Sequence, residues 1–315
     1  MKKDECRITV FTPTYNRIEL IANLYQSLRR QTFRDFEWLV VDDGSTDDTE
    51  QLIKSWIDLE GGVLIRYIKQ ANGGKCRAIN HGLDLAEGEL FFTVDSDDYL
   101  MDNALEKVNL WAEGLPEDEK FCGVVGNLGT SPTETPNTPL KEAYRDASLL
   151  ERYEDYSDLP IDGERAFVFF RDIHREYKYP EYDGENFMTE AVAWNRMGND
   201  EYKMRFHNDI ICIYKYQEGG LTLAGNKLFL ENPFGYGIWL REKGLFCDYS
   251  LKKRLFMYYT FYCDLCERGA YTKSQIARYI SVPILGVFVL ACFRKVIHWI
   301  KLVINRVDPV ASDTL

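Results

Sequence analysis

Three carboxylates stand close together in the chain, directly after a short apolar run. The run, Leu90 to Val94, is rich in aromatic and β-branched residues, which predicts a strand buried on both faces. It ends at Asp95, and Asp97 and Asp98 follow at once. Because like charges this close repel one another, ionising all three carboxylates is costly without a cation. Hard oxygen ligands suit Mg²⁺ or Mn²⁺, above all when the metal also binds phosphate oxygens of a substrate.

The net charge of the chain bears on this interpretation. At a formal charge of −12, the protein repels a nucleotide and lacks the positive field of a nucleic-acid binder. A metal held by the aspartates would bring a diphosphate to such an acidic protein. The alternative is a solvated loop whose side chains cap the next helix, as is common in Asp-rich turns. The three strand–helix units that precede the aspartates favour the metal site.

Those units are predicted from apolar runs that alternate with segments of helical periodicity. Strands are expected at Arg7 to Phe11, Trp38 to Val41, Val63 to Ile68 and Leu90 to Val94. Helices are expected at Glu19 to Arg30, from a Ser45 cap to about Leu59, and from Lys75 to Leu85. This alternation predicts an α/β fold with a doubly wound, mainly parallel sheet and flanking helices.

Polar stretches follow all four predicted strands. They are Thr12 to Asn16, Asp42-Asp43, Lys69 to Lys75 and Asp95 to Asp98. In open α/β sheets, ligands bind at the carboxyl ends of the strands. Topology alone therefore brings these stretches to one edge of the sheet.

The remainder of the chain changes character. The predicted elements are a Pro-rich loop at Thr130 to Leu140, a strand at Ala166 to Phe170, a helix at Phe187 to Met197, a strand at Ile210 to Tyr216, and helices from Asn226 to Ala277. We therefore expect an α/β domain at residues 1–225, a helical extension at residues 226–277, and an apolar and amphipathic tail at residues 278–315.

The tail predicts contact with a membrane or with protein. Tyr279 to Phe293 is apolar but shorter than the roughly 20 residues needed to span a bilayer. A basic face then stands opposite an apolar one, with Arg294, Lys295, His298 and Lys301 against Val296, Ile300, Val303 and Val307. Basic amphipathic helices lie in the membrane interface. The alternative is a helix hairpin that packs on the domain or on a second subunit, in a homo-oligomer.

Cysteine usage and the N-terminus predict a reduced, cytosolic protein. The eight cysteines form no framework, and the close pair Cys263 and Cys266 lacks the further ligands of a zinc site. Free thiols on one helix face are expected there. The N-terminus runs into the first strand without an apolar signal region. Of the four histidines, His207 is the one proposed as an extra group beside the metal.

Six motifs, in this order along the chain, resemble those of a family 2 glycosyltransferase of GT-A fold. They are Thr12-Pro13-Thr14-Tyr15-Asn16-Arg17, Gln31-Thr32-Phe33, Asp42-Asp43-Gly44-Ser45-Thr46-Asp47, Asn72-Gly73-Gly74-Lys75, Ala86-Glu87-Gly88-Glu89 and Asp95-Ser96-Asp97-Asp98. The match covers about Ile8 to Thr222. The resemblance implies a metal-dependent hexosyltransferase whose donor is a nucleotide-sugar, most often a UDP-sugar, and whose acceptor is a saccharide.

The resemblance also implies roles on the donor side. Tyr15 would stack on uracil, Asp43 would accept its N3 proton, and Lys75 would lie near the diphosphate as a point charge. Asp97 would be the principal ligand of Mn²⁺ or Mg²⁺, with Asp95 as a further ligand. The implied nucleotide-sugar contacts are Pro13, Thr14, Tyr15, Asn16, Asp43, Lys75, Asp95 and Ser96.

On the acceptor side, most such enzymes invert the anomeric centre in one displacement, which requires a general base. The family often shows a Glu-Asp pair there, and this chain has Glu185-Asn186, without the second acid. Glu190 is the preferred base because it precedes a helix-like run, and Glu185 is the reserve. Trp194 lies one turn after Glu190, where it could meet an acceptor sugar.

Two other functions stay open at this point. Phosphate hydrolysis by an Asp nucleophile would place the Asp-x-Asp pair after the first strand, which here ends in Thr-Pro-Thr-Tyr-Asn. A non-catalytic nucleotide-sugar-binding protein is kept open by the missing second acid. A lipid-linked acceptor of bacterial capsule, cell-wall or lipopolysaccharide synthesis would fit a membrane-bound tail. We therefore expect a cytoplasmic protein, peripheral on the inner face of the cytoplasmic membrane.

Overall fold

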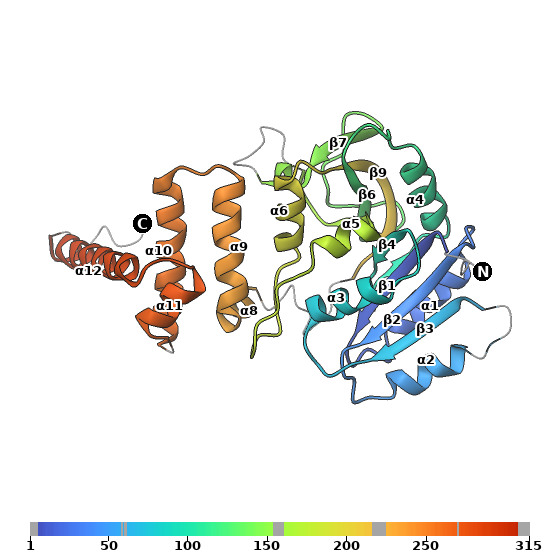
Figure 1. Cartoon of the computed structure of the whole chain (residues 1–315), viewed down its shortest axis with the longest axis horizontal. Helices are drawn as coiled ribbons and strands as arrows, with labels where there is room; N and C mark the ends of the chain where they lie inside the picture. The colour runs from blue at the N-terminus through green and yellow to red at the C-terminus, as the bar shows by residue number, and fades with distance from the viewer. Residues whose placement is uncertain are drawn as a thin grey trace. The chain divides into compact units, whose positions relative to one another are not determined.

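A computed structural model describes residues 6–57, 59, 62–153, 161–215, 225–269 and 271–307, with side chains as far as Lys295. The chain divides into two compact units, Met1–Gly225 and Asn226–Leu315 (Figure 1). Each unit is described by itself below.

The first unit is built around one nine-stranded sheet. Its strands run in the order β3-β2-β1-β4-β8-β6-β9-β5, with β7 beside β9. The strands are β1 (Ile8–Thr14), β2 (Phe36–Asp42), β3 (Leu64–Lys69), β4 (Leu90–Thr93), β5 (Tyr99–Leu100), β6 (Phe121–Gly129), β7 (Tyr144–Ser148), β8 (Arg165–Phe170) and β9 (Lys203–Ile213). The first four strands pair in parallel, whereas β8 runs antiparallel between β4 and β6.

Helices cover both faces of this sheet. The helices of the first unit are α1 (Ile21–Arg29), α2 (Thr49–Ile57), α3 (Lys75–Leu85), α4 (Ala104–Glu113), the 3₁₀ helix η1 (Leu149–Arg152), α5 (Arg171–Glu176) and α6 (Ala191–Asn199). Successive strand residues point to opposite faces. Val10 of β1 packs in one core cluster with α1, α2 and α4, and the next residue, Phe11, faces Gly82 of α3. The predicted α/β class is confirmed.

The two central strands explain why the polar loops converge. All residues of β2 are buried, as are all of β1 except Pro13. Polar side chains inside this core are hydrogen-bonded: Glu37 of β2 accepts from the Thr9 hydroxyl and from Arg66 of β3. The strands are thereby fixed in register, and their carboxyl ends form one edge.

Several predicted boundaries were wrong. Helix α2 begins at Thr49 and not at Ser45, because the Ser45 N–H donates to Asp42 and its hydroxyl accepts from Asn16. Helix α6 begins at Ala191, after Phe187, and β9 begins at Lys203, before Ile210. Strands β6 and β7 were not predicted at all. Their partner β9 is far away in sequence, so no local pattern announces the pairing.

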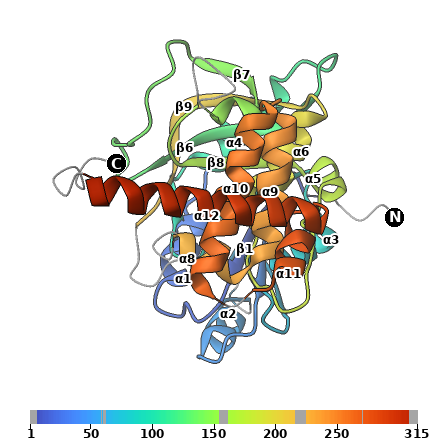
Figure 2. The same ribbon diagram turned by 90° about the vertical axis from the view of Figure 1, so that its left-hand side faces the viewer.

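The second unit is helical, as predicted for the C-terminal region. Its helices are α8 (Asn226–Glu231), α9 (Pro233–Phe246), α10 (Leu251–Arg268), α11 (Lys273–Tyr279) and α12 (Ile284–Val307). Figure 2 shows α12 crossing α10, and their shared core includes Phe261, Leu265 and Val287. Cys263 and Cys266 are free, partly buried thiols.

The apolar run Tyr279 to Phe293 is not one continuous segment. Ser281 adopts a positive φ of 52°, and Pro283 follows it, so α11 ends before α12 starts. Among the described residues, no single helix has the length and apolar character to cross a bilayer. Two neighbouring helical segments, Lys273–Tyr279 and Ile284–Lys295, have that length and apolar character only when they are taken together, and they are bent by 113° relative to each other. The predicted basic residues His298 and Lys301 lie beyond the described side chains.

Candidate functional site

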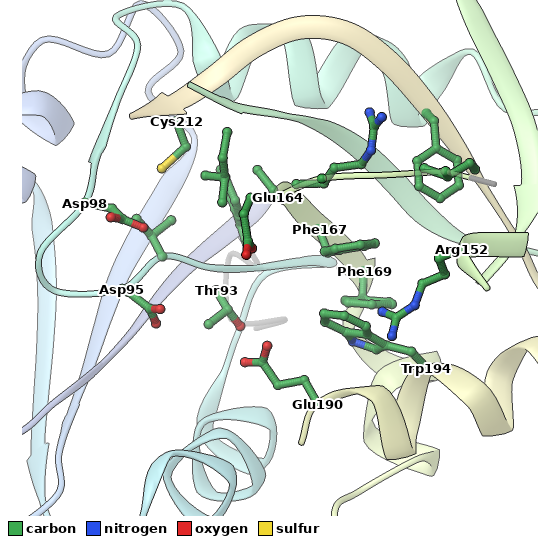
Figure 3. A pocket seen from close by; sticks show the side chains of 18 of the residues that line it. Thr93, Asp95, Asp98, Arg152, Glu164, Phe167, Phe169, Glu190, Trp194 and Cys212 are labelled. Atoms are coloured by element: carbon green, nitrogen blue, oxygen red, sulfur yellow. The ribbon is translucent and has the colours of Figure 1, made fainter. Parts of the chain in front are cut away.

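A cavity of about 510 Å³ lies in the first unit, within the range of small-molecule sites. Its walls come from segments far apart in sequence: α3, the end of β4, η1, the start of β8, and α6 (Figure 3). One end carries the carboxylates of Asp95, Asp98 and Glu190. The other end is aromatic and contains Trp194.

Lys75 joins two of the predicted site residues. It is the first residue of α3, and its Nζ lies 2.8 Å from the Asp95 carboxylate and 3.1 Å from Glu190. Burial alone would lower the pKa of Lys75, but the charges of Asp95 and Glu190 outweigh it and raise that pKa well above its ordinary value. Lys75 is therefore a charged bridge in the pocket.

The carboxylates of Asp97 and Asp98 lie close to that of Asp95, as the sequence predicted. Burial and the charge of Asp95 raise the pKa of Asp97, although Arg17 opposes this. Burial, then Asp95 and Asp97, raise the pKa of Asp98 to about 8. The repulsion among these carboxylates is therefore only partly offset by the neighbouring cations Lys75 and Arg17.

This chemistry fits a divalent cation. No three His, Cys, Asp or Glu side chains of the described chain converge to hold an ion by themselves. Mg²⁺ and similar ions commonly take only one or two carboxylates and complete their coordination with water and substrate phosphates. Asp95, Asp97 and Asp98 are the residues that could supply those carboxylates.

Asp43 organises the loop that starts α3. It is buried, and its carboxylate accepts from the N–H groups of Gly73 (2.9 Å) and Gly74 (2.7 Å) and from Gln70 (2.8 Å). A carboxylate has about four lone-pair sites, so one remains for a ligand. Gly74 adopts a φ of +90°, and a Cβ there would lie 1.7 Å from the Asn186 carbonyl oxygen. Only glycine fits this turn.

The loop after β1 is tied to the loop after β2. Asn16, with a φ of 51°, accepts at Oδ1 from the N–H of Thr46 and of Asp47. Its neighbour Tyr15 is 47% exposed, so the ring is not part of the core and can receive a ligand. Pro13 and Thr14 complete this end of β1.

The aromatic end of the pocket is built by α6, β8 and η1. The Trp194 ring lies 4.4 Å from that of Phe167, and the Arg152 guanidinium lies 4.7 Å from the Trp194 centroid. Figure 3 shows Trp194 between Glu190 and Arg152. Trp194 thus lies in the same pocket as Glu190, one helical turn away.

Other predicted residues lie elsewhere. Glu185 lines a separate, smaller pocket of about 20 Å³. His207 stacks on Trp111 at 4.0 Å and does not line the larger pocket, so its place beside a metal stays a prediction. Ser96 is buried, and Asp97, unlike Asp98, is not part of the pocket wall.

Sequence reasoning missed four charged residues of the wall: Arg152, Asp162, Glu164 and Arg165. Glu164 directly precedes β8, and because β8 runs antiparallel to β4, its start lies beside the end of β4. The predicted strand at Ala166 to Phe170 follows Glu164 closely, but its antiparallel pairing with β4 is not a local sequence signal. Arg152 had no signal, since it ends η1, which directly follows the unpredicted strand β7.

Comparison with known proteins shows the family of this chain. Residues 9–178, more than half of the chain, match the sequence model described as Glycosyl transferase family 2. The chain belongs to this family. The expected family is therefore confirmed, and the protein is a glycosyltransferase.

One relative of this glycosyltransferase matches over nearly its whole length. It is the GalNAc(5)-diNAcBac-PP-undecaprenol beta-1,3-glucosyltransferase of Campylobacter jejuni, 26% identical over 295 residues, covering 88% of this chain and 89% of the relative. A shorter match is to the poly(ribitol-phosphate) beta-N-acetylglucosaminyltransferase TarS of Staphylococcus aureus. It is 31% identical and covers 46% of this chain and 25% of the relative.

Solved structures agree on the fold. S. aureus TarS 1–349 in complex with UDP superposes with a TM-score of 0.54 at 19% identity, covering 85% of this chain and 73% of the TarS 1–349 chain. The mannosyltransferase PcManGT from Pyrobaculum calidifontis, in complex with GDP-Man and Mn²⁺, gives 0.54 at 17% identity, covering 91% and 86%. The expected GT-A fold is confirmed.

A buried histidine in the pocket wall predicts sensitivity to acid. His174 packs against the rings of Phe91, Phe169 and Tyr179, and neither ring nitrogen has a hydrogen-bond partner within the described structure. Burial lowers the pKa of His174 to about 3. An unfolded histidine titrates near 6.5, so between these values the unfolded chain binds more protons and stability falls as the pH drops.

We expect the wild-type protein to lose about 2 kcal/mol more unfolding free energy than H174L between pH 7 and pH 5. Leucine fills a similar volume and cannot bind a proton. Urea unfolding of both proteins at pH 7, 6 and 5 measures the difference. If the unfolding free energies of the two proteins changed equally with pH, the pKa of His174 would not be lowered in the folded state.

Proposed function

We propose that this glycosyltransferase transfers a hexose from a UDP-sugar to a hydroxyl of a saccharide acceptor, with inversion of the anomeric centre. The observation that carries the proposal is the meeting of Lys75, Asp95 and Glu190 in one pocket, beside Asp97 and Asp98. Donor-binding, metal-binding and basic groups are then within reach of one another.

The donor would bind at the carboxyl ends of β1, β2 and β4. The exposed Tyr15 ring offers a stacking surface for uracil, and the remaining lone pair of Asp43 can accept a hydrogen bond from the uracil N3–H. Pro13, Thr14 and Asn16 would border the base, with Ser96 and Asp95 nearer the ribose and sugar. Lys75 would place its charge near the diphosphate.

The metal, Mn²⁺ or Mg²⁺, would be held through Asp97 and Asp95, with Asp98 beside them. When bound, it would neutralise charge on the leaving diphosphate, which is worth several kcal/mol in such reactions. The support is the closeness of three carboxylates at the end of β4, whose repulsion Lys75 offsets only in part.

Glu190 would act as the general base. The acceptor oxygen attacks the anomeric carbon as the bond from that carbon to the diphosphate oxygen breaks, and the hydroxyl proton passes to the Glu190 carboxylate. Its place at the start of α6 and the Lys75 ammonium orient that carboxylate into the pocket. Trp194, one turn on, would hold the acceptor sugar in place.

Replacing Glu190 by Gln should lower the transfer rate by about 10²–10⁴-fold, because the amide cannot take the hydroxyl proton. UDP binding should persist, since Glu190 is on the acceptor side. E185Q is the matched control and should retain transfer, because Glu185 lines another pocket. Transfer assays with calorimetry on UDP separate the effects. Full activity of E190Q with loss in E185Q would reverse the assignment.

Metal-dependent donor binding provides a second test. UDP with Mn²⁺ should stabilise the wild-type protein by about 2.7 kcal/mol at a concentration 100 times Kd. D97A should lose most of this gain, while D102N, which changes an exposed aspartate paired with Arg30, should keep it. Thermal unfolding with UDP, Mn²⁺, both and neither measures the coupling. Equal stabilisation of D97A and D102N would refute metal binding through Asp97.

We also propose that the acceptor is lipid-linked, within bacterial capsule, cell-wall or lipopolysaccharide synthesis. The support is the undecaprenol-linked substrate in the name of the Campylobacter relative. The protein would then work on the inner face of the cytoplasmic membrane. Helix α12 offers a contact surface, because Leu285, Phe288, Val289 and Phe293 are all about half exposed or more and follow helical spacing.

Replacing Leu285 and Phe293 together by Gln should weaken binding to anionic vesicles at least about tenfold, because inserting each side chain contributes up to about 1.5–3 kcal/mol. L110Q is the control, since Leu110 is equally exposed but lies on α4. Co-sedimentation with phosphatidylglycerol vesicles measures both. If the double variant binds as the wild type does and instead changes mass in solution, the surface contacts a second subunit.

A further inference from the structure

Arg152 is a pocket residue that the proposed reaction does not use. It ends η1, and its guanidinium lies 4.7 Å from the Trp194 ring centroid and 5.2 Å from that of Tyr153. Stacking on aromatic rings fixes the plane of a guanidinium while its N–H groups remain able to donate. We refer to Arg152 and Trp194 together as the Arg152–Trp194 shelf.

The other two cations of the pocket wall are already paired. Lys75 bridges Asp95 and Glu190, and Arg165 donates to Asn127 at 2.7 Å and lies 3.6 Å from Asp162. Within the described part of the chain, Arg152 has no carboxylate partner. Its polar contact is a long one, 3.4 Å, to the Tyr153 hydroxyl.

Arg152 has no carboxylate partner among the described residues, although the protein is strongly acidic. The chain has 50 acidic and 38 basic side chains, so an arginine has many carboxylates to choose from. A partly buried guanidinium without an anion pays a desolvation cost that a bound anion would offset. The pocket thus has an acidic end that attracts cations and a basic end that attracts an anion.

We propose that the Arg152–Trp194 shelf binds an oxyanion carried by the acceptor, a carboxylate or a phosphate. This rests on the proposed function, in which Glu190 receives the proton of the acceptor hydroxyl. Glu190 and Trp194 are four positions apart, about 6 Å along a helix. An anion on Arg152 is therefore carried by the reacting sugar or by the group next to it.

The chemistry of arginine suits this role. Its planar fork donates two parallel hydrogen bonds to a carboxylate or phosphate. The donor diphosphate is a poor candidate for the same position, because Asp95 and Asp98 are at the opposite end of the pocket, beyond Trp194 (Figure 3), and Lys75 is paired with Asp95. An uncharged acceptor would leave the guanidinium unpaired.

Binding of matched probes to the UDP-loaded full-length protein tests the shelf. The probes are methyl glucuronide, which carries a carboxylate, glucose 1-phosphate, and the neutral methyl glucoside. Ligand-observed NMR titrations give their affinities. Wild-type protein should bind at least one anionic probe roughly 10- to 100-fold more tightly than the neutral one, as expected for hydrogen bonds to a charged group. The tighter anion identifies a uronic acid or a phosphate-linked acceptor.

Three variants separate charge from structure. R152M keeps the side-chain stem and should lose the anion preference, whereas R152K keeps the charge without the fork and should recover part of it. R29M is the matched control: Arg29 also lies over an aromatic ring, that of Tyr25, but outside the pocket wall. It should retain the full preference.

Two results would overturn the proposal: equal affinity of the wild type for neutral and anionic probes, or an unchanged preference in R152M. UDP binding, measured first on each protein, keeps this test distinct from that of the proposed function. If the wild-type protein does not bind UDP, the donor assignment is refuted. If it binds UDP but shows no preference for the anionic probes, only the proposed anion site at the Arg152–Trp194 shelf is refuted.

Discussion

The ammonium of Lys75 holds together two carboxylates that the chain delivers from different directions. Asp95 follows β4 and Glu190 precedes α6, and both lie against the same Nζ. Without that charge the two carboxylates would repel each other in a partly enclosed pocket. The spacing between β4 and α6, and with it the shape of the pocket, therefore depends on where α3 begins.

The start of α3 is in turn set by a glycine that serves two segments at once. The positive φ of Gly74 lets the turn present its N–H to Asp43, and its missing side chain leaves room for the carbonyl of Asn186. Asn186 lies four residues before Glu190. One position thus admits both the helix that carries Lys75 and the segment that leads to the proposed base. A side chain at this position would displace both Lys75 and the segment that leads to Glu190.

The sequence predicted the half of the site that depends on parallel strands. Asp43, Lys75 and Asp95 each follow a strand or its loop, and parallel strands end at a common edge, so their meeting follows from local patterns alone. Arg152 and Glu164 belong to the half built by η1 and β8. Their positions depend on antiparallel and long-range pairings, which single-residue patterns do not encode. Charge state was equally unpredictable, since the pKa of Asp98 reflects burial that only the assembled fold creates.

The separation of charge within the pocket has a consequence for the proposed reaction. Carboxylates crowd one end and an arginine occupies the other, with the Trp194 ring between them (Figure 3). An acceptor with one anionic group is attracted to the arginine and repelled by the carboxylates, so only one of its two orientations is favourable. In that orientation the end without the anion faces Glu190. The field therefore selects which hydroxyl is presented. Orientation of this kind lowers the entropic part of the barrier, in addition to the affinity that the anion gains from Arg152.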